Sequence, residues 1–169
     1  MSEAASRFAL VPASYVFLLR DTDAGTEALL QLRGETGYME HHWAAGAAGH
    51  VERGETAYDA ARREAEEELG VTPLDLTFVT SMQRTQYADA VDERIDFFFT
   101  ARRWSGEPHI VEPGKALELR WCPLTDLPDP VVPHERIVLE GLATGLPAYS
   151  THGFHAGGVP AATIPEGRP

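Results

Sequence analysis

The sequence predicts one α/β domain in which a mixed β-sheet lies between two helical layers. Short runs of β-branched and aromatic residues, such as 14–20 and 94–104, have the composition of buried strands. Segments 56–69 and 134–143 instead have helical composition and spacing. Strands flanking two unlike helices are typical of an α/β/α sandwich. A chain of 169 residues is long enough for one such domain with a single core.

The expected strands follow one another along the chain. Residues 14–20 and 27–33 should form a hairpin around the turn 21–25, and the small side chains of 43–48 predict a short strand. Three consecutive phenylalanines in 94–104 predict a central strand that is buried on both faces. The remaining strands are expected at 74–84 and 116–122.

We expect the folded domain to span residues 13–146. Residues 1–12 predict a polar lead with at most a weak amphipathic turn at 8–11. Residues 147–169 are dominated by Pro, Gly, Ala and small polar side chains, which cannot build a core of their own. This composition predicts a disordered tail; the alternative is an arm that lies across the domain or a partner subunit.

The stretch 49–71 is the most informative part of the chain. Its helix is expected to begin at Glu55-Thr56 and to end at Gly70, and Pro73 prevents continuation. The stretch carries seven acidic residues, namely Glu52, Glu55, Asp59, Glu64, Glu66, Glu67 and Glu68.

Helical phase sorts these acids into different faces. Glu64, Glu67 and Glu68 fall within one arc of about 100°, beside an apolar stripe made of Tyr58, Ala61, Ala65 and Leu69. Like charges at this spacing repel unless a cation lies between them. Carboxylate ligands alone favour a hard ion such as Mg²⁺ or Mn²⁺. The alternative is that the acids form only a solvated helix face.

The spacing of residues in this stretch resembles a known motif. Gly49, Glu55, the run Arg63-Glu64-Ala65, the pair Glu67-Glu68 and the pair Gly70-Val71 fill every position of the Nudix box. The protein therefore resembles the MutT-like members of the Nudix hydrolase superfamily, and the resemblance implies a Nudix-type α/β/α sandwich. Two positions depart from the usual pattern, since Ala65 replaces a larger aliphatic and Ala48 precedes Gly49 where a second glycine is common. Neither departure removes a metal ligand.

The resemblance also implies an activity and a set of site residues. Members of the family use Mg²⁺ to direct water onto the pyrophosphate of a nucleoside diphosphate linked to another moiety, including nucleoside triphosphates. By analogy Glu64, Glu67 and Glu68 are metal ligands and catalytic residues, and a backbone carbonyl at or beside Gly49 is a further ligand. Glu55 and Arg63 match positions that stabilise the loop and helix through an ion pair.

Three further residues are expected at the site by the same analogy. The segment RWSGEPHIVEPGK resembles a loop of MutT-type enzymes and places Glu112 on their additional catalytic glutamate, with Glu107 as the alternative. Arg33 corresponds to an arginine that faces the phosphates. Tyr87 matches a tyrosine that is common in dinucleoside polyphosphate hydrolases, whereas the proline typical of ADP-ribose hydrolases is absent.

Composition limits the partners. A net charge of −12 and a pI near 4.9 argue against binding to long nucleic acid, which uses basic patches, but allow a small nucleotide held through metal. The sequence has no apolar run of about 18 residues and no recognisable signal peptide, so we expect a cytoplasmic protein with no membrane partner. A homodimer is compatible with the sequence.

Two other functions remain open at this stage. Isopentenyl diphosphate isomerase shares the fold but uses a catalytic cysteine, for which Cys122 is the sole candidate, without the motif that surrounds that cysteine in the isomerases. A non-catalytic Nudix-fold module that binds a nucleotide is the other alternative. Such modules usually lose acidic residues of the box, and this chain keeps all of them.

Overall fold

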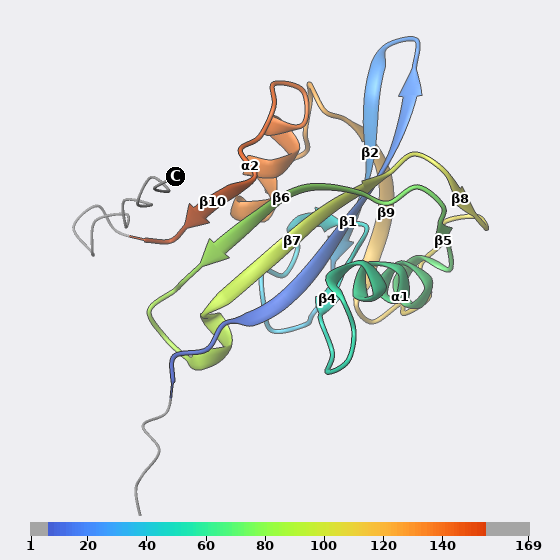
Figure 1. Cartoon of the computed structure of the whole chain (residues 1–169). Helices are drawn as coiled ribbons and strands as arrows, with labels where there is room; N and C mark the ends of the chain where they lie inside the picture. Colours follow the sequence, from blue (N-terminus) through green and yellow to red (C-terminus); the bar gives the residue numbers. More distant parts are fainter. Residues whose placement is uncertain (1–6, 155–169) are drawn as a thin grey trace, which may run out of the picture.

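The computed structural model describes residues 7–154 as a mixed β-sheet with a helix on each side (Figure 1). The main sheet has the strand order β10-β6-β7-β1-β2-β3, with β4 also paired to β1 and β9 also paired to β2. In chain order the elements are β1 (Val11–Thr22), β2 (Gly25–Arg33), β3 (Trp43–Ala45), β4 (Ala47–His50), α1 (Ala57–Leu69), β5 (Thr72–Pro73), β6 (Thr77–Arg84), the 3₁₀ turn η1 (Ala90–Asp92), β7 (Arg94–Ala101), β8 (Trp104–Ser105), β9 (Ala116–Pro123), α2 (Pro133–Gly141) and β10 (Tyr149–His152).

The centre of the sheet confirms the expectation of a buried middle strand. β7 pairs in parallel with β1 and antiparallel with β6. The side chains of Phe98 and Phe99 are both fully buried and belong to different core clusters, one on each face of the sheet. Phe98 stacks on Tyr15 with a ring-centroid distance of 4.7 Å. Three consecutive phenylalanines are therefore accommodated because both faces of β7 are covered.

The two helices cover opposite faces of the sheet. Alternate residues of β1 point to opposite sides. Val16 and Leu18 pack in the cluster that contains the buried face of α1, whereas Tyr15 and Phe17 pack in the cluster that contains Val138 and Leu139 of α2. The predicted α/β/α sandwich is therefore confirmed.

Local sequence signals fix both ends of α1. Thr56 caps the helix by accepting from the backbone N–H of Asp59, and the Asp59 carboxylate accepts from the N–H of Thr56 in return. Gly70 ends the helix in the left-handed conformation. The helix buries Ala60, Ala61, Ala65 and Leu69. Tyr58 differs from the expected apolar stripe because its side chain is 45% exposed, although its ring contacts Phe99 at a centroid distance of 4.7 Å.

Several expected boundaries were wrong where pairing partners change. β1 begins at Val11, inside the expected lead, because Val11 already pairs with Arg94 of β7, and residues 8–10 form no amphipathic turn. The expected strand 43–48 is divided at Gly46, since β3 pairs with β2 and β4 pairs with β1. The expected strand 94–104 ends at Ala101, and its last residue belongs to the small β5–β8 sheet.

The expected tail also differs. Residues 149–152 form β10, which pairs in parallel with β6, so the expectation of disorder from residue 147 was wrong for this part. Figure 1 shows β10 beside β6 at the edge of the sheet, close to α2. The rest of the expected tail, residues 155–169, lies outside the described residues.

The second helix begins at Pro133, the residue expected at its start, and ends at Gly141, before the expected end at residue 143. Pro133 occupies its first turn, where the missing N–H costs nothing. The helix buries Val138 and Leu139 together with the polar residues His134 and Glu135, while Ile137 is exposed. Within residues 7–154, neither helix combines the length and apolar character needed to cross a membrane.

Candidate active site

Strand β4 lies directly against the acidic face of α1. The backbone N–H of Ala48 donates to Oε2 of Glu68 at 2.9 Å, and Arg63 donates to the carbonyl oxygen of His50 at 2.9 Å. Between these two contacts, Gly49 lies so close to Glu64 that a Cβ atom would overlap its carboxylate. The short strand and the helix thus bring the first glycine of the motif and two of its glutamates together.

The ion pair expected within the motif is present. Arg63 donates two hydrogen bonds to Glu55, from Nε at 2.7 Å and from Nη2 at 3.1 Å, and Glu55 also accepts from the backbone N–H of Glu52 at 2.9 Å. These contacts lower the pKa of Glu55. A bidentate pair of this kind fixes the orientation of both groups, so it holds the loop before α1 against the helix.

Arg63 also contacts the acids expected to bind metal. Its Nη1 atom lies 2.6 Å from Glu64 and 3.1 Å from Glu67. Glu67 is largely exposed, whereas Glu64 and Glu68 are partly buried. Burial raises the pKa of Glu64 despite the neighbouring guanidinium. It raises the pKa of Glu68 to about 7, with the charge of Glu64 acting in the same direction.

The residues present fit a hard divalent cation, although no ready-made cage is visible. Within residues 7–154, no three His, Cys, Asp or Glu side chains are grouped as a metal site. The donor set at the α1–β4 contact nevertheless consists of carboxylate oxygens, which suit Mg²⁺ and Mn²⁺. Arg63 already places a positive charge between Glu64 and Glu67. The raised pKa values of Glu64 and Glu68 indicate negative groups that a cation would stabilise.

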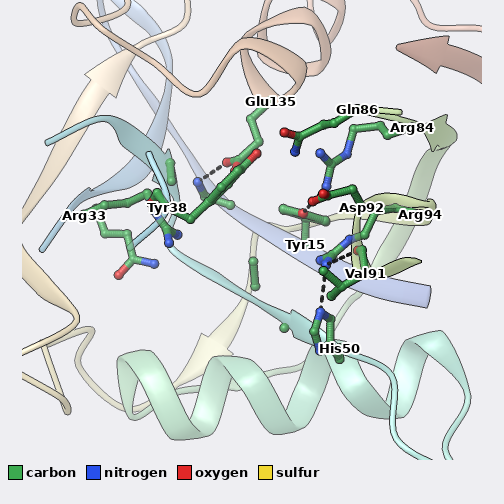
Figure 2. Close-up of a pocket in the computed structure, with 15 residues that line it drawn as sticks. Tyr15, Arg33, Tyr38, His50, Arg84, Gln86, Val91, Asp92, Arg94 and Glu135 are labelled. Atoms are coloured by element: carbon green, nitrogen blue, oxygen red, sulfur yellow. Dashed lines mark hydrogen bonds between the residues drawn. The ribbon is translucent and has the colours of Figure 1, made fainter. Parts of the chain in front are cut away.

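A cavity of about 380 Å³ opens on the other side of β4. Figure 2 shows Arg33 and Tyr38 on one of its sides, Arg84, Gln86, Asp92 and Arg94 on the opposite side, and Glu135 reaching in from α2. Ala48, Gly49 and His50 belong to its lining. These are the residues that contact Glu68, Glu64 and Arg63, so one strand is shared by the cavity and the acidic helix face.

Three arginines line this cavity in a chain whose net charge is −12. Arg84 is buried and pairs with the buried carboxylate of Asp96, and it also donates to the hydroxyl of Tyr15 at 3.4 Å. Arg94 lies 3.7 Å from Asp96 and contacts Nε2 of His50 at 2.8 Å. One buried carboxylate therefore faces two guanidinium groups at this wall, which also carries the carboxylate of Asp92.

Glu135, like Arg84 and Arg94, is a pocket residue that the sequence analysis did not predict. Its side chain is almost fully buried and accepts a hydrogen bond from the backbone N–H of Ala45. Burial raises its pKa to about 7. The available signal was helical spacing, because Glu135 precedes the buried Leu139 by four residues and so shares its side of α2.

The other predicted residues occupy different positions. Arg33 lines the cavity, and it donates to the carbonyl oxygen of Tyr38 at 3.0 Å. Glu112 is exposed and pairs with Lys115 at 2.8 Å, on a loop that donates from Val111 to the carbonyl oxygen of Glu68. Tyr87 is outside the cavity lining; its ring lies edge-on to Phe154 at a centroid distance of 6.2 Å. The roles assigned to these residues stay predictions.

The fold agrees with comparisons to known proteins. The model of the NUDIX domain family matches residues 10–142, and the chain therefore belongs to this family. The MutT NUDIX hydrolase from Burkholderia pseudomallei is 29% identical with a TM-score of 0.67, and the match covers 78% of this chain and 97% of that one.

Other similar proteins are enzymes of different kinds. A C. elegans Ap4A hydrolase is 21% identical (TM-score 0.57, covering 78% of this chain and 96% of that one), which shows a shared fold. An isopentenyl-diphosphate Delta-isomerase from Cereibacter sphaeroides strain KD131 is 34% identical over 117 residues. That match covers 66% of this chain and 64% of the isomerase, so the chain spans less than two thirds of the length of this relative.

Proposed function

We propose that this protein is a Mg²⁺- or Mn²⁺-dependent hydrolase that cleaves the pyrophosphate bond of a nucleoside triphosphate or a related nucleoside diphosphate derivative. The observation that carries the proposal is the shared strand β4. Its residues line the cavity on one side and contact Glu64, Glu68 and Arg63 on the other. A nucleotide bound in the cavity therefore has its phosphates directed across β4 toward the acidic face of α1.

Glu64, Glu67 and Glu68, together with a backbone carbonyl at or beside Gly49, would hold the metal. When bound, such an ion supplies charge neutralisation for the phosphates and lowers the pKa of an attacking water. The Glu55–Arg63 pair holds the loop before α1 against the helix, so that these oxygens stay together. Glu112 is proposed as the additional acid, since its loop contacts the last turn of α1 near Glu68.

The cavity supplies the groups that would orient the nucleotide. Arg33 and Arg94 carry positive charge at its two sides and would bind phosphate oxygens. Gln31 and Glu135 offer hydrogen-bonding groups at a wall made of small residues, which suits the edge of a nucleobase. Tyr38 offers a partly exposed aromatic ring for stacking.

The test is hydrolysis of a nucleotide panel with and without divalent metal. The panel includes nucleoside triphosphates and dinucleoside polyphosphates, because the structural neighbours include MutT hydrolases and an Ap4A hydrolase. We expect metal-dependent release of a nucleoside monophosphate together with pyrophosphate or the remaining nucleotide. Tight nucleotide binding without any cleavage would instead support the binding-module alternative.

Isopentenyl diphosphate isomerase is the second candidate, favoured by the 34% identity to the Cereibacter protein. Its expected cysteine is poorly placed here. Cys122 is 2% exposed, packs in the α2-side core and is absent from the cavity lining. Burial also raises the pKa of its thiol, which disfavours the reactive thiolate. An isomerisation assay with isopentenyl diphosphate discriminates the two functions directly.

A further inference from the structure

The strand β10 lies beyond the segment matched by the family model, yet it is firmly attached to β6. Ser81 donates its backbone N–H to the carbonyl oxygen of Ala148 at 3.0 Å. Thr80 donates its hydroxyl to the carbonyl oxygen of Pro147 at 2.7 Å. The hydroxyl of Tyr149 donates to Gln83 at 2.8 Å. Backbone and side-chain bonds therefore join the two strands along most of their shared length.

The end of β10 is fitted closely to the residue that follows β6. Thr85 donates its backbone N–H to the carbonyl oxygen of His152 at 3.2 Å. Gly153 follows with a φ of +86°, and a Cβ atom at this position would overlap the carbonyl oxygen of Thr85. Phe154 then places its ring edge-on to Tyr87. Thr85 and Tyr87 are thus both in contact with the C-terminal segment.

Thr85 and Tyr87 alternate along the chain with two residues that line the cavity. Arg84, the last residue of β6, is in register with His152, and Gln86 lies between Thr85 and Tyr87. Both Arg84 and Gln86 line the cavity. The His152 ring lies 6.1 Å from that of His134, beside the buried Arg84–Asp96 pair. Displacing the end of β10 would therefore move one wall of the cavity.

We propose that residues 147–154 are a positioning element of the substrate site, which holds Arg84 and Gln86 in place through Thr85. This inference rests on the proposed nucleotide hydrolysis for its kinetic consequence. It makes Gly153 a positioning residue, because only a residue without a Cβ atom allows β10 to approach Thr85 so closely. The segment acts on substrate binding, whereas the acids of α1 act on the chemical step.

The test compares Gly153→Ala with Gly145→Ala. Both glycines have positive φ, +86° and +96°, so both variants carry a similar backbone strain. A Cβ atom on Gly145 meets nothing within 4 Å. We expect Gly153→Ala to raise KM for the best nucleotide roughly tenfold with kcat nearly unchanged, since misplaced binding groups weaken binding before they affect chemistry. Gly145→Ala should leave KM at the value of the unaltered protein.

Amide hydrogen exchange gives a second readout that needs no activity. Gly153→Ala should increase exchange at Thr85 and Tyr87, while residues 57–69 of α1 stay as protected as in Gly145→Ala. Equal KM values in the two variants, or unchanged exchange at Thr85 and Tyr87, would overturn the positioning role. If the unaltered protein cleaves no nucleotide, the proposed function fails while the exchange measurement still decides the positioning role. If Gly153→Ala does not fold, Tyr149→Phe, which removes only the bond to Gln83, replaces it in both measurements with the same expected direction.

Discussion

A side chain on Gly49 would come within 2.5 Å of both carboxylate oxygens of Glu64. This closeness explains why the motif has glycine at its first position. The backbone of β4 must approach the helix closely enough for Ala48 to donate to Glu68 and for His50 to accept from Arg63. Any larger residue would turn the Glu64 carboxylate away from the strand.

Gly49→Ala should therefore reduce activity while changing stability little. The atoms that the new methyl group would meet belong to the end of the flexible Glu64 side chain, which can turn aside, and the displaced Glu64 should lower kcat at least about tenfold. Gly114→Ala is the matched control because a Cβ atom there meets nothing within 4 Å. Denaturant unfolding and steady-state kinetics measure the two effects. Wild-type kcat in Gly49→Ala would show that the close contact is unnecessary for the site.

Removing the charge of Glu64 or Glu68 should lower kcat far more than removing the charge of the neighbouring Glu66. Glu64→Gln and Glu68→Gln each remove a negative charge at the β4 contact, where metal-site charge stabilisation is worth several kcal/mol. We expect losses of about two orders of magnitude or more in kcat. Glu66→Gln alters an exposed residue whose carboxylate accepts from Thr72 at 2.9 Å, so its kcat should stay near that of the unaltered protein. Equal kcat values in all three variants would contradict a metal role for this helix face.

Divalent metal should raise the melting temperature of the protein. The acids at the β4 contact carry raised pKa values, and a bound cation would relieve the unfavourable burial of their charge. A ligand at 100 times its Kd adds about 2.7 kcal/mol to the free energy of unfolding. Melts in Mg²⁺ or Mn²⁺ are compared with melts in chelator, and Glu68→Gln should show a smaller shift. Identical midpoints for the unaltered protein in saturating metal and in chelator would argue against the site.

Glu135 should make stability fall as pH rises. Its folded-state pKa is about 7, above the ordinary value of 4.5, so the folded state holds its proton more tightly than the unfolded state. The stabilising contribution of the protonated form is complete below about pH 4.5 and is lost as pH rises through 7. Glu135→Gln keeps a neutral acceptor for Ala45, and its stability advantage should grow by on the order of 2 kcal/mol between pH 5 and pH 8. Urea unfolding at both pH values measures this difference, and a constant gap would show that Glu135 does not titrate in this range.

Cys122→Ala should leave hydrolysis intact. The thiol is buried in the core on the α2 side and does not reach the cavity. Removing a single buried sulfur should cost at most a few kcal/mol of stability without altering kcat or KM. A loss of activity in a folded Cys122→Ala protein, measured alongside isopentenyl diphosphate isomerisation, would favour the cysteine-dependent alternative.

Local sequence signals determined the parts of the protein that depend on neighbours in the chain. Thr56, Asp59 and Gly70 define the ends of α1 through contacts within a few residues. Helical phase placed Ala61, Ala65 and Leu69 in the core. The motif spacing indicated the Glu55–Arg63 pair, the family and the sandwich fold. The run of three phenylalanines predicted a central strand, because a strand that is apolar on both faces must be covered on both. β7 is such a strand.

Only the tertiary structure decided features that depend on residues far apart in the chain. Tyr149–His152 has weak strand composition, yet it forms β10 because β6 offers an unpaired edge and Thr80 and Ser81 supply donors. Glu135 forms part of the cavity because α2 packs it beside Ala45, 90 residues earlier. Arg84 and Arg94 become a pocket wall because they share Asp96 across paired strands. Sequence spacing specifies a helix cap or a motif, but a cavity arises only when separate elements pack together.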